Sequence, residues 1–402
     1  MISVLFDEKR TYFAAGDKEF SSAQKGWGKW LTFRRGIGII RTNTTRESDL
    51  SRKTVREYMT QNFGYTAGRA VVALEMEDYY VWDCSVVKAG GKYHMFSSRW
   101  PKKYGFGWNW LFHSEIIRSV SDRPEGPYIF QNVVLPRRGR QYFDGMNTHN
   151  TCIKAWGGKF YLYHMGCTYS WDVPEGEAIP QDYALETWNR KRIGLAVADT
   201  IDGTFSRRDT PLLEPRDCTY WDCTITTNPS VAILPDGTTY MIYKSRQSVG
   251  KPLQLGIAVA DRPDGSFRRL SDKPILQFGD EDFHIEDPFI WYDEKRKKFC
   301  LIAKDDVKHG AYGITGEWGS GFYAESDDCM DFEIAPQPKV YSRQVRWADG
   351  RETIQGNLER PSLLFDENGT PTQLFCASGY GSAPYCFEGN TFIVSMELVR
   401  ED

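Results

Sequence analysis

The sequence predicts an all-β protein, a five-bladed β-propeller with about four antiparallel strands in each blade. Three observations indicate this fold. A unit made of a short β run, a turn and an aromatic-rich strand recurs five times, most copies are followed by two further β runs, and helix signals are scarce. Because a propeller blade is a four-stranded sheet built from one repeat, we expect residues 1–402 to form a single propeller domain.

Each repeat opens on a polar residue and carries a turn signal where a two-stranded hairpin needs one, such as Gly-Gly, Asp-Gly or Glu-Asn-Gly. The openings are 59 to 78 residues apart. A WD40 blade is shorter, about 40–45 residues, so we reject that type of propeller. The five opening residues are Asp83, Asn150, Asn228, Asp287 and Arg360.

The fifth repeat has room for only three strands before the chain ends at Asp402. We expect the segment 28–40, GKWLTFRRGIGII, to supply the fourth strand and close the ring, which protects the sheet edges. The best helix signal lies at 46–62, with apolar residues at helical spacing and Gly64 just beyond its end.

The composition of the chain excludes some classes of function. The chain has 50 Lys and Arg against 54 Asp and Glu, which argues against a nucleic-acid partner bound through phosphates. No apolar run approaches the length of a membrane span. The first residues, MISVLFDEKRTYF, do not resemble a signal peptide, so we expect a soluble protein, cytoplasmic unless a signal was removed and the protein is periplasmic or secreted. Nine Cys without a CxxC pair predict buried free thiols.

The candidate site follows from the repeat. The innermost strand of each blade lines the central channel, so the residues that open the five repeats should meet at one mouth of it. Aromatic residues of the following loops, including Trp100, can wall this mouth. The expected lining residues are Trp82 and Asp83, His149 and Asn150, Asn228, His284, Glu286 and Asp287, and Glu359 and Arg360.

Two separated carboxylates beside aromatic platforms suit glycoside cleavage. One carboxylic acid protonates the leaving oxygen, and one carboxylate activates water or attacks the sugar. Asp83 and Glu286 come from different blades, so a sugar can lie between them. A structural interpretation stays open, because an Asp at a strand start is usually a turn residue and Glu286 can pair with an arginine. The histidines at 149 and 284 can likewise belong to the core.

The Asp at the start of the first inner strand and the acid-Xaa-Pro motif of the fourth repeat resemble five-bladed glycoside hydrolases, namely family 43 and its relatives 32, 62 and 117. The resemblance implies that Asp83, in WDCSVV, is the general base, with Cys84 in place of the usual Pro. It implies that Glu286, in HIEDPF, is the general acid, with Asp287 in place of Gly.

The family's third acid, which tunes the general acid, is matched by Asn228 in TTNPSV. Either Asp222, six residues earlier, takes this role, or Asn228 orients without charge. In family 117 a His beside the blade-four Glu has been assigned an acid role, which makes His284 a rival acid. Some relatives hold calcium or another ion in the channel, and scattered Asp, Asn and His leave a structural ion open here, but no ligand spacing indicates one specifically, so we expect no cofactor.

These observations predict an exo-acting, inverting glycoside hydrolase for plant or algal cell-wall oligosaccharides, with the loops 99–113 and 167–191 closing one end of the channel. One alternative is a non-catalytic carbohydrate-binding propeller, which Asn228 favours. The other is a glycoside phosphorylase that binds phosphate through a basic cluster of Arg360, Lys244 and Arg246.

Basic residues near the expected mouth also predict an anionic group on the substrate, because arginine binds carboxylate or sulfate through a bidentate fork. The alternative is pairing within the protein, of Glu359 with Arg360 and of Asp305 and Asp306 with Lys304. The basic residues in question are Arg99, Lys244, Arg246, Lys304 and Arg360.

Overall fold

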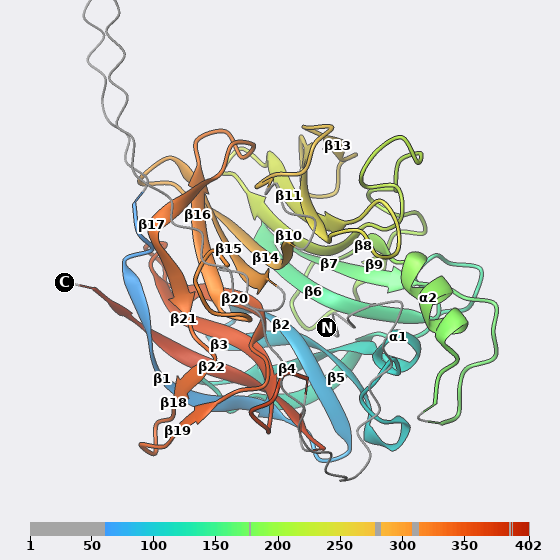
Figure 1. Cartoon of the computed structure of the whole chain (residues 1–402), viewed down its shortest axis with the longest axis horizontal. Helices are drawn as coiled ribbons and strands as arrows, with labels where there is room; N and C mark the ends of the chain where they lie inside the picture. Colours follow the sequence, from blue (N-terminus) through green and yellow to red (C-terminus); the bar gives the residue numbers. More distant parts are fainter. Residues whose placement is uncertain are drawn as a thin grey trace, which may run out of the picture. The chain divides into compact units, whose positions relative to one another are not determined.

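Five antiparallel sheets of four strands each make up a five-bladed β-propeller (Figure 1). The computed structural model describes residues 61–401 apart from 177, 278–282, 308–312, 386 and 388. The prediction of fold class is confirmed, and each repeat forms one blade. The strands of blade 1 are β2 (Tyr79–Ala89), β3 (Lys92–Pro101), β4 (Glu115–Ser121) and β5 (Ile129–Leu135). Those of blade 2 are β6 (Asn147–Trp156), β7 (Lys159–Cys167), β8 (Arg192–Ala198) and β9 (Ser206–Arg207).

The remaining blades have the same order, from the innermost strand outward. Blade 3 contains β10 (Thr227–Ile233), β11 (Thr239–Ser245), β12 (Gln254–Ala260) and β13 (Arg268–Arg269). Blade 4 contains β14 (Phe283–Asp293), β15 (Lys298–Val307), β16 (Gly321–Ser326) and β17 (Glu333–Tyr341). Blade 5 contains β20 (Glu359–Phe365), β21 (Pro371–Gly379), β22 (Thr391–Arg400) and β1 (Tyr65–Glu75).

Blade 5 closes the ring with β1, which pairs antiparallel with β22, for example Val72 with Val394. The closing strand was therefore predicted in the wrong place: it is the run YTAGRAVVALE at 65–75, not the segment 28–40. The reason is connectivity, because β1 ends just before β2 begins and so joins the last blade to the first by a short link. The segment 28–40, and all but the last two residues of the helix predicted at 46–62, lie outside the described residues.

The five inner strands β2, β6, β10, β14 and β20 contact one another in cyclic order, and Figure 1 shows them converging around the centre of the ring. The apolar core lies between blades. One cluster, for example, joins Tyr163 and Leu195 of blade 2 to Met241 and Ala258 of blade 3. Eight cysteines are described, all of them free and six of them buried.

Every inner strand is interrupted by a β-bulge at its start, and the residue at the bulge has a positive φ. The register shifts there, for example between Trp82 and Cys84 in blade 1. Such left-handed backbone is costly for most side chains and is best tolerated by Asn and Asp among residues other than glycine. The five bulge residues and their φ angles are Asp83 (41°), Asn150 (56°), Asn228 (52°), Asp287 (55°) and Arg360 (57°).

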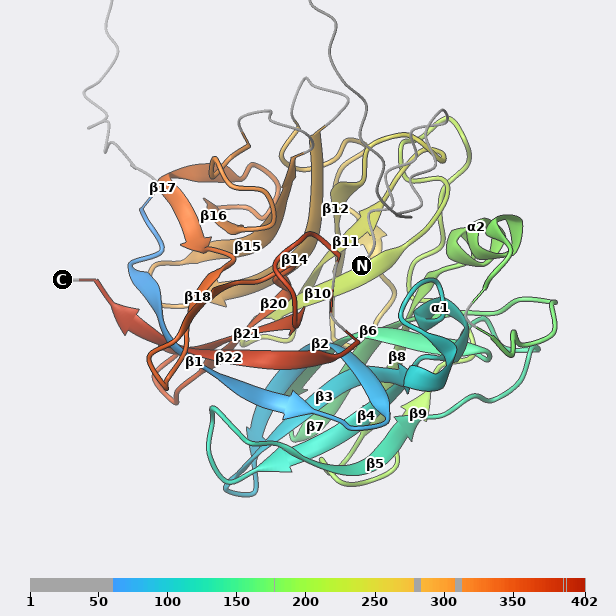
Figure 2. The ribbon, with the colours of Figure 1, turned by 60° about the horizontal axis from the view of Figure 1, so that its bottom comes forward.

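Two loop insertions and one hairpin lie outside the blade framework. The loop after β3 carries α1 (Trp110–His113), and the loop between β7 and β8 carries α2 (Gln181–Asn189). Figures 1 and 2 both show α1 and α2 side by side near the ends of β6 and β8. Also outside the blades are a short 3-10 helix, η1 (Lys102–Tyr104), and a hairpin of β18 (Gln344–Arg346) and β19 (Glu352–Ile354). No helix in the described part of the chain is long and apolar enough to cross a membrane.

Blades 2 and 3 each contain a buried aspartate that pairs with arginines, in the sequence pattern Arg-x5-Asp-x5-Asn. We call this arrangement the latch. In blade 2 the carboxylate of Asp144 contacts Arg138 at 2.6 Å and His164 of β7 at 3.1 Å. It also lies 3.5 Å from Arg207 of the outermost strand. This latch fixes the loop that leads into the inner strand against the other strands of its own blade.

In blade 3 the carboxylate of Asp222 takes the same place. It accepts hydrogen bonds from Arg216 at 2.6 Å, from Arg269 of the outermost strand at 2.5 Å and from the Tyr243 hydroxyl at 2.7 Å. Gly256 lies opposite Tyr243, where a Cβ would approach the Tyr243 ring to 2.4 Å. The same latch, built twice, therefore positions the inner strands of blades 2 and 3.

We expect Asp144→Asn to destabilise the protein by about 3 kcal/mol, because it leaves buried arginine and histidine groups without their carboxylate. Although burial opposes it, hydrogen bonds and charge from His164 and Arg138 lower the pKa of Asp144 to about 2. A carboxyl with a lowered pKa stabilises the fold above its ordinary pKa, and this stability is lost as the pH falls through about 2. Between pH 5 and pH 2 the melting temperature should therefore fall more steeply in the native protein than in the variant.

The matched control is Asp209→Asn, since Asp209 pairs with the same Arg138 at 2.7 Å but its side chain is 70% exposed. Exposed ion pairs contribute little, so this variant should unfold within about 1 kcal/mol of the native protein. Equal destabilisation by both substitutions would contradict the latch.

Candidate functional site

The side chains of the bulge residues connect one blade to the next around the central axis. Asn228 donates a hydrogen bond to Asp287 at 2.7 Å. Asp287 in turn accepts from the backbone of Arg360 at 3.2 Å and from its guanidinium at 3.3 Å. Asp83 accepts from the backbone N–H of Asn150 at 3.1 Å. The structure thus brings together the five openings that the sequence predicted at one mouth, and all five residues are buried.

Asp83 is held by donors from two blades. Its carboxylate accepts hydrogen bonds from the hydroxyl of Ser98 in its own blade (2.8 Å) and from the backbone and hydroxyl of Thr151 in blade 2 (both 3.2 Å). Burial raises the pKa of Asp83, although the charge of Arg360 and these hydrogen bonds oppose the shift. The residue therefore joins blades 1 and 2, and its pKa is moved toward the range useful for proton transfer.

His149 connects Asp83 to the aromatic wall. Its Nε2 lies 3.4 Å from the Asp83 carboxylate, and its Nδ1 lies 2.8 Å from the Ser114 hydroxyl. Burial, with the positive charge of Arg360, holds the pKa of His149 well below its usual value, so the imidazole is neutral. A neutral ring has one donor, and only Nε2 faces an acceptor-only carboxylate, so Nε2–H points to Asp83 and Ser114 donates to Nδ1.

Two equivalent Lys–Glu pairs join blades 3, 4 and 5. Lys244 of β11 bonds to Glu286 of the next inner strand at 3.1 Å, and Lys304 of β15 bonds to Glu359 of the following one at 2.7 Å. All four side chains are fully buried. The two lysines occupy the same place in their blades, because Lys244 pairs across the strands with Thr227 as Lys304 does with Glu286.

These pairs correct the predicted partners of the basic residues. Arg360 pairs with Asp287 and not with Glu359, whose partner is Lys304. Asp306 lies farther from Lys304, at 3.9 Å, and Asp305 instead accepts from the backbone and hydroxyl of Thr315. Pairing within the protein, the alternative to anion binding, is thus what the structure has for Lys244, Lys304, Arg360 and Arg99, the last of which pairs with Glu115 at 2.9 Å.

Asp222 does not join this cluster. Its carboxylate belongs to the blade 3 latch, held by an arginine of the outermost strand. Hydrogen bonds from Tyr243 and Arg216 and the charge of Arg269 lower the pKa of Asp222, although burial opposes the shift. Asn228, the other candidate for the tuning role, bonds instead to Asp287, the neighbour of Glu286.

His284 lies two residues before Glu286 on β14, hence on the same face of that strand. Its Nδ1 accepts the backbone N–H of Leu253 at 3.3 Å. This places the rival acid beside Glu286 and fixes its ring against blade 3.

Indole rings line the blade 1 side of the cluster. Trp82 and Trp100, both predicted there, are buried, and the ring of Trp100 lies 6.0 Å from that of His149. Trp110 of α1 lies closer, at 4.9 Å. The indole N–H groups of these three tryptophans are buried and have no hydrogen-bond partner among the described residues.

Sequence reasoning missed two residues carried by the 167–191 loop. Trp188 lies at the end of α2, and Lys191 follows just before β8; both side chains are buried. The Lys191 ammonium lies 3.4 Å from the centre of the Trp188 ring and 5.6 Å from that of Trp110. Arg246, which was predicted, lies 3.8 Å from the same Trp188 ring. The only available signal was the cluster of aromatic and basic residues in TWNRKR.

Together these contacts form one continuous cluster between the two candidate carboxylates. Asp83 contacts His149, the tilted His149 and Trp110 rings lie 4.9 Å apart, and the Lys191 ammonium lies over the Trp110 ring. The charge of Glu286 acts electrostatically on Lys191. The cluster therefore runs from a carboxyl of blade 1 toward a carboxyl of blade 4.

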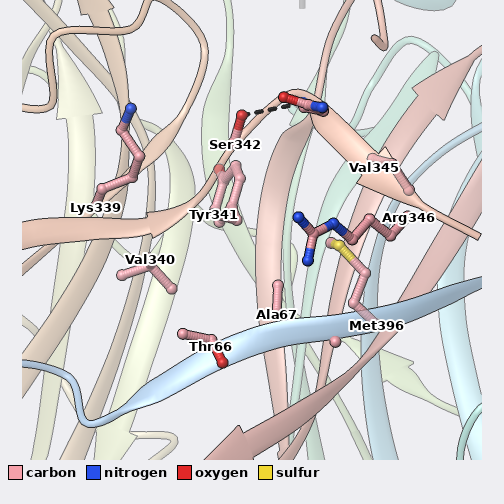
Figure 3. A pocket seen from close by; sticks show the side chains of 11 residues that line it. Thr66, Ala67, Lys339, Val340, Tyr341, Ser342, Val345, Arg346 and Met396 are labelled. Atoms are coloured by element: carbon pink, nitrogen blue, oxygen red, sulfur yellow. Dashed lines mark hydrogen bonds between the residues drawn. The ribbon is translucent and has the colours of Figure 1, made fainter. Parts of the chain in front are cut away.

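A cavity of about 320 Å³ lies elsewhere, at the outer rim between β1, β17 and β18 (Figure 3). Its cations are neutralised by neighbours outside the cavity, Lys339 by Glu317 and Arg346 by Glu352. No carboxylate and none of the predicted site residues is among its lining residues, so it lacks an acid–base pair. Within the described residues, no group of His, Cys, Asp and Glu is arranged to hold a metal ion.

No known family model matches the sequence, and neither does any curated protein. Solved structures match the fold. An RGII complex of BT0996 gives a TM-score of 0.60 at 12% identity, over 85% of this protein and 93% of that one. Zg3597, a family 117 glycoside hydrolase of the marine bacterium Zobellia galactanivorans, gives 0.55 at 17% identity, over 85% and 90%.

CoXyl43, a family 43 β-xylosidase/α-arabinofuranosidase from a compost microbial metagenome in complex with xylotriose, gives a TM-score of 0.52 at 14% identity, over 84% of this protein and 96% of that one. At these identities the likeness is one of fold. The resemblance predicted from the sequence is confirmed at that level: the chain has the five-bladed propeller that is found in glycoside hydrolases of families 43 and 117.

Proposed function

We propose that this protein is a glycoside hydrolase and that the sugar is cleaved between Asp83 and Glu286. The observation that carries the proposal is the cluster that runs from Asp83 on the inner strand of blade 1 through His149 and Trp110 to Lys191, on which the charge of Glu286 from the inner strand of blade 4 acts. Hydrolysis of a glycosidic bond needs two carboxyl groups on opposite sides of the bond. The shared fold with families 43 and 117 supports the same conclusion.

Glu286 is the general acid in this proposal and Asp83 the general base. Asp83 must free a lone pair to accept a proton from water. The longest of its polar contacts is the one to His149, at 3.4 Å, so a water enters most easily there. Asn228 acts as a positioning residue, because its amide holds Asp287 and thereby the strand that presents Glu286.

The substrate proposed is an oligosaccharide of plant or algal cell walls, attacked from one end. The loops that contain α1 and α2 support exo action, since they bring Trp110, Trp188 and Lys191 against one side of the cluster. The xylotriose bound to the similarly folded CoXyl43 supports an oligosaccharide as the ligand.

We expect Glu286→Gln to lower turnover at least about a hundredfold, the lower end of what general acid–base catalysis contributes. The substitution also leaves the buried Lys244 ammonium without its carboxylate, so the variant should melt lower than the native protein, and the rates are compared at a temperature where both are folded. Initial rates on the best substrate from a screen of cell-wall oligosaccharides provide the measurement. Retention of full activity would remove Glu286 from the mechanism, and binding of oligosaccharides without turnover by the native protein would favour a binding propeller.

Asp83→Asn should lower both turnover and stability. The amide places an NH₂ group against the N–H donors of Asn150 and Thr151, so blades 1 and 2 lose contact as well as the base. Ser98→Ala is the control, since it removes one donor to Asp83 but keeps the carboxylate. If both variants lose stability while only Asp83→Asn loses turnover at a temperature where it is folded, the base role stands; equal activity of the two would contradict it.

The proposed mechanism is inverting, as a water must fit between the sugar and the base. Proton NMR of the first product should therefore show the anomer opposite to that of the substrate. The appearance of the substrate's own anomer first would mean that one carboxyl acts as a nucleophile.

A further inference from the structure

Lys191 is a buried cation for which the described part of the protein offers no hydrogen-bond acceptor. Its side chain is 0% exposed, and its Nζ has no hydrogen-bond partner there. Its backbone is fixed between blades, because its carbonyl accepts the N–H of Thr226 in blade 3 at 3.3 Å. An unpaired buried ammonium is costly, so a position of this kind requires an explanation beyond packing.

Arg246, at the end of a neighbouring strand, is a second buried cation with an unpaired nitrogen among the described residues. It lies just past β11, its side chain is nearly buried, and its Nε has no partner among the described residues. Its one hydrogen bond among the described residues is a long one of 3.5 Å, to the side-chain oxygen of Asn189. Both cations lie against the ring of Trp188, at 3.4 Å for Lys191 and 3.8 Å for Arg246. Cation–π contacts of this kind only partly replace a negative charge.

Within the described residues the local charge balance is positive. Lys191 and Arg246 both interact with the carboxylate of Glu286, which already bonds to Lys244. Lys244 also acts on Asp287, whose carboxylate pairs with Arg360. Burial, followed by repulsion from Lys244 and Arg246, holds the pKa of Lys191 well below its usual value. An added anion would offset both effects.

We propose that Lys191, Arg246 and Trp188 form a subsite for an anionic substituent of the sugar, a carboxylate or a sulfate ester; the assignment to a substrate rests on the proposed hydrolase function. The aromatic surroundings favour an anion that is carried by a sugar over a free inorganic anion. Sugar rings pack on Trp faces, and the Trp110 indole N–H beside Lys191 is without a partner among the described residues. The arginine fork fits the two oxygens of a carboxylate.

The test is a binding titration followed by NMR with monosaccharides, which the protein cannot hydrolyse. The probes are D-galacturonate, D-glucuronate and galactose 6-sulfate, the neutral sugars galactose and glucose, and inorganic phosphate. At least one anionic sugar should bind about tenfold or more tightly than its neutral counterpart. Lys191→Met should remove about ten- to a hundredfold of that affinity, the loss of a charge-assisted hydrogen bond, and should change neutral-sugar affinity less than twofold.

Two variants complete the design. Lys159→Met is the matched control, because Lys159 lies in the same blade but is half exposed and pairs with Asp199, and it should change nothing. Arg246→Gln should weaken anionic sugars as Lys191→Met does. Lys191→Met should melt no lower than the native protein, because an unpaired buried charge is removed; a merely structural lysine would instead lower the melting temperature.

Three outcomes would overturn the inference: equal affinity for anionic and neutral sugars, equal weakening of both by the two site variants, or Lys191-dependent binding of inorganic phosphate alone, which would favour a phosphorylase. The proposed hydrolase function fails by a different result, the absence of turnover on any oligosaccharide, neutral or anionic. Lys191-dependent binding of uronate can be observed in either case.

Discussion

The β-bulge at the start of each inner strand is the constraint on which the rest of the molecule depends. At this point the backbone turns into the left-handed region, and one residue of each blade projects toward the axis. The hydrogen bonds that link Asn228, Asp287 and Arg360, and Asp83 to blade 2, form because these five positions meet there. The blades are joined at their inner ends by polar contacts, whereas apolar clusters join them farther out.

The same constraint explains why structural and chemical roles coincide. Asn and Asp tolerate a positive φ best among residues other than glycine, so four of the five positions would be polar whatever the protein does. Arg360 is the exception, with a φ of 57° and no such preference. Its guanidinium neutralises Asp287 and also acts electrostatically on Asp83, so the one residue that departs from the backbone preference links the carboxyls of blades 4 and 1.

Buried ion pairs divide the charged residues of the site into two groups. Lys304 with Glu359 and Lys244 with Glu286 satisfy one another within the protein. Lys191 and Arg246 lie in the same region without such a carboxylate within the described chain. Both groups are buried in the same surroundings, so the difference lies in their partners. That difference, rather than the number of basic residues, is the reason to assign anion binding to the second group.

The sequence by itself determined the five blades, the inner strand of each and the meeting of the residues that open the repeats, because these features repeat along the chain and depend on local backbone preference. It did not determine the closing strand at 65–75, which belongs to the last blade but precedes the first. Nor did it determine which charges pair. Lys304 pairs with Glu359, and Asp222 pairs with Arg269. The partners are far apart in the sequence, so no local pattern predicts these pairs. Only the tertiary structure brought Trp188 and Lys191 to the site, since they come from a loop insertion outside the repeat, and the place of such an insertion is decided by the packing of whole blades.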